Sequence, residues 1–156
     1  MSGRASNTFS RWSPWLIQPL PDSAAALAVD SGSDGSVYAI AASTLYQMSA
    51  SGWTPIPAAG LTLQAVAVGD ATHIWLLDTS GSVYFYGGSG DSLTPVALGA
   101  PAGDIKGSAD GTLWHCNAGD ANAYRYISQG TLPSEAIPVG LGVTSVQKAT
   151  ASSFGA

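Results

Sequence analysis

Aromatic side chains and carboxylates near turns are the residues of this sequence with the clearest capacity for chemistry. Indole and phenol rings stack on the apolar face of a pyranose, while carboxylate and amide oxygens accept hydrogen bonds from sugar hydroxyls. Such shallow contacts are weak singly and gain strength by repetition. The candidate ligand-binding residues are Trp12, Trp15, Trp53, Tyr84, Asp34, Asp110 and Asn117.

The tryptophans have both a binding and a structural explanation. Trp12 and Trp15 lie beside the expected connection between two successive repeats, and Trp53 occupies the equivalent position one repeat later. Exposed there, their rings form platforms for a sugar; because tryptophan is usually well buried, they can instead pack between layers of the fold. Trp75 and Trp114 fall in apolar strand-like segments and are expected in the core.

The polar candidates and Tyr84 also have both a binding and a structural explanation. Asp34, Asp110 and Asn117 lie at or near expected turns, where they accept hydrogen bonds from sugar hydroxyls or, more commonly, serve the turn itself. Tyr84 belongs to a stripe of tyrosines on outer strands. Such a stripe binds a sugar or a partner protein, or simply pairs across strands and stiffens an exposed sheet.

Catalytic chemistry is poorly represented. His115 and Cys116 are adjacent on an expected strand, so their side chains point to opposite faces and cannot form a nucleophile and base pair. Glu135 is the only glutamate, and Asp34 and Asp110 need not converge as paired carboxylates. No His and Cys cluster has zinc-ligand spacing. We therefore expect a protein that is not an enzyme and that uses no metal and no cofactor.

An internal repeat organises the elements that carry these residues. Four strand-like segments have an aromatic residue near the middle, and Phe9, Tyr46, Tyr84 and Tyr124 are separated by 37, 38 and 40 residues. Counting from Tyr124 to the C-terminus and on from the N-terminus to Phe9 gives 41 residues. The chain therefore holds four repeats when its ends are joined as a circle.

Each repeat predicts four short β-strands. A proline-containing strand such as 53–57 comes first and an apolar inner strand such as 65–68 second. A strand ending in an aromatic residue is third, and the strand with the repeated central aromatic is last. The pairs Asp34-Gly35, Ser80-Gly81 and Asp110-Gly111 supply tight turns between strands, and proline suits a sheet edge.

These features predict an all-β fold, a β-propeller of four-stranded antiparallel blades with about four repeats of 37–41 residues. Residues 1–156 form a single domain with repeats at about 13–48, 49–86, 87–126 and 127–156. Residues 7–12 complete the last repeat, so one blade is split between the N- and C-termini. The chain closes a four-bladed ring alone, contributes blades to a larger ring with other chains, or is part of a longer protein.

The second repeat resembles a known family. Residues 53–57 (WTPIP), 65–69 (AVAVG), 74–75 (IW) and 80–84 (SGSVY) carry a pattern that resembles the tectonin repeat of β-propeller lectins. The resemblance implies a carbohydrate-binding protein, a lectin that recognises surface glycans, including methylated sugars and bacterial lipopolysaccharide. It also implies shallow, repeated aromatic sites.

Composition argues against several other functions. Charged residues make up 10% of the 156 residues, the net charge is −5, and the five Lys and Arg are scattered, so no nucleic acid partner is expected. No apolar stretch approaches the roughly 20 residues that span a bilayer, so no membrane insertion is expected. No signal peptide is visible at the N-terminus, which predicts a cytoplasmic protein or one exported by a non-signal route.

A structural or assembly role is the alternative to sugar binding. A chain with few charges and half-blades at both ends is suited to joining neighbouring copies, as a virion, filament or scaffold subunit does. Open Trp12, Trp15 and Trp53 side chains favour the lectin, whereas their burial in an interface favours assembly. The two roles are compatible, because a homo-oligomer formed by split-blade completion multiplies weak sugar sites.

Overall fold

The computed structural model describes residues 19–58, 60–90, 92–119, 122–127 and 135–137, and the regular secondary structure in these ranges is almost entirely β-strand. The first sheet contains β1 (Ala28–Ser31), β2 (Val37–Ala41), β3 (Thr44–Ser49) and β4 (Gly52–Ile56). The second contains β5 (Leu63–Asp70), β6 (His73–Asp78), β7 (Val83–Tyr86) and β8 (Leu93–Val96). The third contains β9 (Ala102–Gly107), β10 (Thr112–Asn117), β11 (Ala123–Ile127) and β12 (Glu135–Ile137). A 3-10 helix, η1 (Pro21–Ser23), precedes the first sheet.

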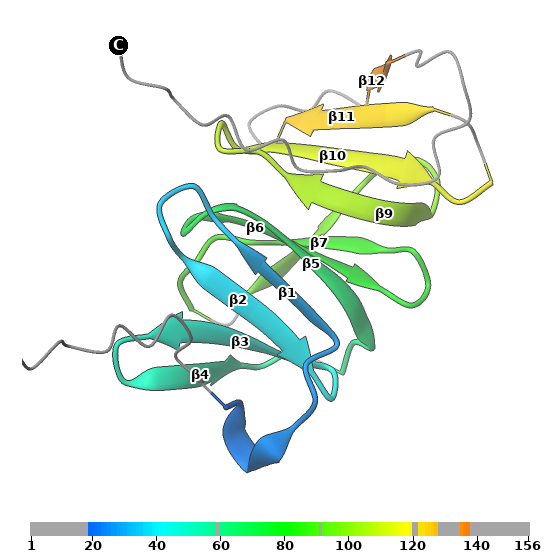
Figure 1. Cartoon of the computed structure of the whole chain (residues 1–156). Helices are drawn as coiled ribbons and strands as arrows, with labels where there is room; N and C mark the ends of the chain where they lie inside the picture. The colour runs from blue at the N-terminus through cyan, green and yellow to red at the C-terminus, as the bar shows by residue number, and fades with distance from the viewer. Residues whose placement is uncertain (1–18, 59, 91, 120–121, 128–134, 138–156) are drawn as a thin grey trace, which may run out of the picture.

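Each sheet is an antiparallel meander whose strands pair in chain order, and the three sheets follow one another in Figure 1. The prediction of an all-β fold with four-stranded antiparallel sheets is therefore confirmed. Ring closure and a fourth blade stay predictions, because residues 7–12 and 138–156 lie outside the described residues.

Glycine turns connect the strands at the predicted places. Gly35 and Gly111 lie in the β1–β2 and β9–β10 turns, and Gly81 lies in the β6–β7 turn. Their φ angles are +84°, +78° and +84°, a region that side chains with a Cβ rarely adopt. The tight-turn prediction from these dipeptides is confirmed.

The sheets are offset by one strand from the predicted repeats. The repeat 49–86 began with the proline-containing strand, but that strand is β4 and pairs with β3, with Met48 opposite Trp53. Only two residues separate β3 from β4, and so short a loop favours a hairpin. In the same way β8 closes the second sheet and β12 the third, beyond the predicted repeat ends at 86 and 126. The prediction that the proline strands are sheet edges is confirmed for β4 and β8.

Apolar side chains fill the spaces between neighbouring sheets. In β6 the residues alternate, so Ile74 and Leu76 pack against the first sheet while Trp75 and Leu77 pack against the third. Trp75 is fully buried, which confirms its expected core position. Trp114 is only half-buried, and strand alternation places it on the opposite face of β10 from the second sheet.

Three glycines let the inner strands of neighbouring sheets approach backbone to backbone. Gly32, Gly69 and Gly107 are 37 and 38 residues apart, which is the period of the repeat. A Cβ atom on Gly107 would lie 2.7 Å from the Gly69 nitrogen, and one on Gly69 would overlap the Ser108 carbonyl oxygen. A Cβ atom on Gly32 would lie 2.9 Å from the Asp70 Cα atom. The length of the repeat therefore matches the spacing of the glycines that the close backbone contacts require.

Replacing Gly107 by alanine tests this requirement. The added methyl group meets backbone atoms of the second sheet, so we expect Gly107→Ala to lower the free energy of unfolding by about 2 kcal/mol. Gly103→Ala is the matched control in the same strand, because its Cβ atom would have no neighbour closer than 3.5 Å. Denaturant unfolding measures both variants. Equal stability of the two variants would contradict the close-approach account.

Candidate functional site

Polar residues gather at two opposite ends of the second sheet. Strand β6 begins at His73, beside the β1–β2, β5–β6 and β9–β10 turns, and this end of the sheets is here called the turn end. The same strand finishes at Asp78, where a groove forms beside the connection from β8 to β9. Two of the predicted site residues lie at the turn end, and one lines the groove.

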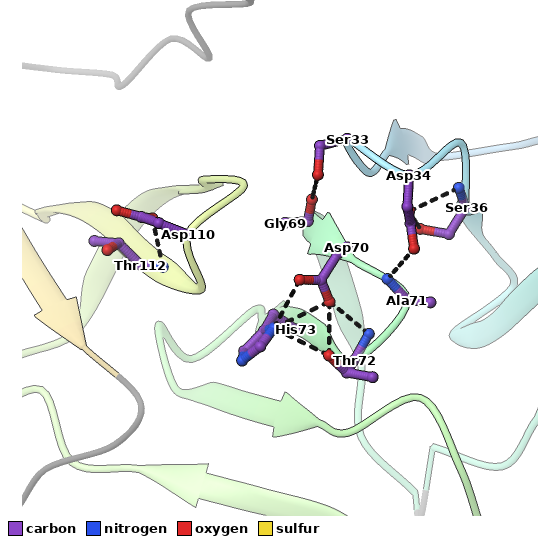
Figure 2. Close-up of polar contacts among 10 residues, drawn as sticks. All are labelled: Ser33, Asp34, Ser36, Gly69, Asp70, Ala71, Thr72, His73, Asp110 and Thr112. Atoms are coloured by element: carbon purple, nitrogen blue, oxygen red, sulfur yellow. Dashed lines mark hydrogen bonds and ion pairs between the residues drawn. The ribbon is translucent and has the colours of Figure 1, made fainter.

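Asp34 joins the first two sheets at the turn end, as Figure 2 shows. Its Oδ1 atom accepts hydrogen bonds from the Ser36 Oγ at 2.7 Å and the Ser36 N–H at 3.0 Å. Its Oδ2 atom accepts a bond of 2.9 Å from the Ala71 N–H in the next sheet. The bonds from the Ser36 hydroxyl and backbone, and that from Ala71, lower the pKa of Asp34 from 3.8 to about 2. All three donors belong to turns, so this carboxylate serves the fold.

The hydrogen bond from a backbone N–H to the aspartate two residues earlier recurs in the β5–β6 and β9–β10 turns. The Thr72 N–H donates to Asp70 Oδ1 at 2.7 Å, and the Thr112 N–H donates to Asp110 Oδ1 at 3.0 Å. Asp-x-Ser/Thr is therefore a repeated tripeptide of this chain, in which the carboxylate caps its own turn. A role in the turn is the more common one expected for Asp34 and Asp110, and the repeated tripeptide is a further sequence signal that favours it over sugar binding.

His73 is packed between the second and third sheets at this end. Its Nδ1 atom lies 3.0 Å from both carboxylate oxygens of Asp70, and its ring is stacked near Trp75 with the ring centres 6.1 Å apart. A Cβ atom on Gly111 of the next turn would lie 3.0 Å from the His73 ring. Burial alone would raise the pKa of Asp70, but the hydrogen bonds from Thr72 and His73 lower it overall. The ring thus fills the space between two sheets.

The pKa of Asp34 predicts a pH dependence of stability. Because the pKa in the folded protein lies below the ordinary value of 3.8, the ionised carboxylate stabilises the fold above pH about 4. That contribution is lost as the pH falls from about 4 towards about 2. We expect Asp34→Asn to lose less stability than the wild type over this interval, measured by denaturant unfolding.

Ser36→Ala is the companion variant, because it keeps the carboxylate and removes the hydroxyl that contributes most to the lowered pKa. It should raise the pKa of Asp34 part of the way to 3.8, as read from carboxyl chemical shifts. An unchanged pKa in Ser36→Ala, or an unchanged pH slope in Asp34→Asn, would contradict this role.

The groove at the other end has a volume of about 300 Å³. Its lining residues are Ser80, Gly81, Ser82, Val83, Tyr84, Pro95, Val96, Leu98, Gly99, Ala100 and Pro101. Gly81 fixes one side, because its carbonyl accepts a 2.8 Å bond from the Ala102 N–H and a Cβ atom at this position would lie 2.6 Å from the Pro101 Cβ atom. The groove is therefore built from a turn and a connection that the sheet-to-sheet packing holds together.

A buried carboxylate supports the wall of the groove. Asp78 is 8% exposed, and its Oδ1 atom accepts bonds from the Ser80 Oγ at 2.6 Å, the Ser80 N–H at 2.8 Å and the Ser82 N–H at 2.9 Å. The Tyr84 hydroxyl donates to Oδ2 over a longer 3.4 Å. Burial alone would raise the pKa of Asp78, but the bonds from Ser80, Ser82 and Tyr84 lower it overall. Asp78 therefore acts as the acceptor at the base of this network.

The structure does not bring the predicted site residues together. Tyr84 is half-buried and lines the groove, whereas Asp34 and Asp110 lie at the turn end. Trp53 is half-buried on the first sheet, and Asn117 is buried at the end of β10. Trp12 and Trp15 lie outside the described residues.

Sequence reasoning missed the carboxylate behind the groove. Asp78 precedes Ser80 with the same Asp-x-Ser spacing as the turn aspartates, and Ser82 follows two residues later. That spacing, combined with the nearby Tyr84, was the available signal. The signal is weak because Asp78 ends an apolar strand, where a carboxylate is not expected to be buried.

Metal-binding groups and membrane-spanning helices are both absent from the described residues. No three His, Cys, Asp or Glu side chains in these ranges are grouped so that they could hold a metal ion. The described ranges also contain no helix with the length and apolar character that crossing a bilayer requires.

Solved structures with a similar fold exist. A streptogramin B lyase has a TM-score of 0.56 and 17% identity over 78% of this chain and 44% of its own. The catalytically inactive H270A virginiamycin B lyase from Staphylococcus aureus, solved with quinupristin, has a TM-score of 0.55 and 15% identity over 77% of this chain and 44% of its own. YCF48 from Cyanidioschyzon merolae has a TM-score of 0.55 and 13% identity over 76% of this chain and 38% of its own. No protein-family model and no curated protein sequence matches the chain.

These similarities establish the fold and nothing finer. The matched proteins are β-propellers, so the described sheets have a β-propeller-like fold, while ring closure and the number of blades stay predictions. The chain spans less than half the length of each of these structures. Because one fold hosts unrelated functions, and these proteins include a lyase, fold alone does not distinguish an enzyme from a binding protein.

Proposed function

We propose that this is a non-catalytic carbohydrate-binding protein and that the groove beside Tyr84 is its sugar site. The observation that carries the proposal is that Tyr84, two serines and several apolar residues line one open groove of about 300 Å³. This volume lies at the small end of ligand pockets in proteins. A sugar needs these two kinds of surface at once, because a pyranose has an apolar face and a rim of hydroxyls.

The direction of the hydrogen bonds favours a neutral sugar. Tyr84 and Ser80 donate their hydroxyl protons to the Asp78 carboxylate, so their oxygen lone pairs remain as acceptors. The Ser82 Oγ lies 2.8 Å from the Ser80 Oγ and continues this chain of hydroxyls. The groove lining contains no Lys, Arg or His to attract an anion. Ligands that donate hydroxyl protons are therefore favoured over glycans bearing carboxylate, sulfate or phosphate groups.

The first sheet contains a natural comparison for this site. Tyr84 lies opposite Pro95 in the second sheet, and Tyr46 lies opposite Pro55 in the first. The hairpin before Tyr46 has no counterpart of the buried carboxylate, since β2 ends at Ala41 where β6 ends at Asp78. The two tyrosines therefore share a strand position and differ in the polar network.

Truncating Tyr84 tests the proposal. A glycan array identifies the strongest neutral ligand, and calorimetric titration then compares variants. We expect Tyr84→Ala to weaken binding by about tenfold, the upper end of what one aromatic contact contributes. Tyr46→Ala, the matched control, should leave the affinity unchanged.

Asp78→Asn tests the polar half of the site, because the amide can no longer accept all the hydroxyl protons that the carboxylate accepts. We expect weaker sugar binding in a folded protein, verified by circular dichroism. Full-strength binding by Tyr84→Ala, or a preference of the wild type for anionic glycans, would overturn the proposed site. Absence of binding to every glycan would overturn the proposed function.

A further inference from the structure

One face of the first sheet has no neighbouring sheet among the described residues. Strand pairing places Leu27, Val29, Ala39 and Ala41 on the face that points away from the second sheet. Met48 of β3, two residues beyond the partner of Ala39, continues this face. These five residues define what is here called the free face, and none of them carries a charge.

The free face has the character of a contact surface. Leu27 and Val29 are each 63% exposed and Met48 is 38% exposed, and these are the large hydrophobic side chains exposed in the described part of the chain. Within those ranges, Leu20 and Ala24 pack over a part of the face near Ala39 and leave the three exposed residues open. Exposed apolar side chains clustered on a single face mark an interaction surface.

The packing of the other sheets indicates what kind of surface fits there. The second sheet is apolar on both faces and has a sheet of this chain against each of them. The first sheet is apolar on both faces, and within the described part of the chain it has such a neighbour on one of them. The free face therefore continues an established pattern of sheet-to-sheet contact.

We propose that the free face packs against the free face of a second copy of this chain, forming a two-fold dimer. Charge decides between this arrangement and a head-to-tail contact with the third sheet. The outward face of the third sheet carries Lys106 and Arg125, both opposite Trp114, together with Asp104. Packing that face onto Leu27 and Val29 would remove charges from water against apolar side chains, which is unfavourable. Two uncharged faces match, and a two-fold contact is the commonest closed arrangement of identical subunits.

A charge placed on the free face tests the dimer. Light scattering of the wild type should give twice the chain mass of 15.7 kDa. Val29→Asp should weaken self-association by more than about tenfold, because a carboxylate would be buried without a partner. Thr54→Asp adds the same charge to an exposed residue of β4 on the opposite face and should leave the dimer intact.

Cross-linking distinguishes the two-fold contact from other assemblies. Val29→Cys should be joined to a second copy by a short bis-maleimide, while the wild type, whose Cys116 is buried, should not. A monomeric wild type would overturn the proposal, as would an open-ended oligomer or equal self-association of Val29→Asp and Thr54→Asp. The proposal does not depend on the sugar site, since Tyr84 belongs to the second sheet.

Discussion

The backbone approach of neighbouring inner strands is the constraint on which the rest of this molecule depends. Gly69 and Gly107 lie where β5 and β9 meet, and a side chain at either would collide with backbone atoms of the other sheet. Only with the strands this close can Trp75 be fully buried between the second and third sheets. Asp34 then reaches the Ala71 N–H across the first pair of sheets. The glycine contacts, the burial of Trp75 and the hydrogen bond of Asp34 therefore all depend on the same close distance between neighbouring sheets.

The groove is a consequence of the same spacing at the other end of the sheets. Gly81 bonds to Ala102, the first residue of β9, so the β6–β7 turn is held against the segment that leads into the third sheet. That contact encloses a space beside Tyr84, and Asp78 orders the hydroxyls along its wall. The polar network is therefore local in sequence, within residues 78–84, while the groove needs two sheets.

Much of the fold could be predicted from the sequence, because its signals are local and periodic. The positions of Gly35 and Gly111 predicted turns, and the 37- and 38-residue steps predicted repeated sheets. The boundary between the first and second sheets was harder to predict, because the two-residue loop before Gly52 is a weaker sequence signal than the tryptophan that follows it. The residues of the candidate site were the hardest feature to predict from the sequence. Burial of Asp78 depends on the turn that folds over it, and the separation of Trp53 from Tyr84 depends on which sheet each strand joins.

The central claim, that the groove beside Tyr84 binds a neutral sugar, is tested most directly by the amide chemical shifts of the wild-type protein during titration with a neutral oligosaccharide. Saturable shifts confined to residues 80–84 and 95–101 are the predicted result. Shifts centred on the turn end near Asp34 and Asp110, on Trp53, or nowhere in the chain would contradict it.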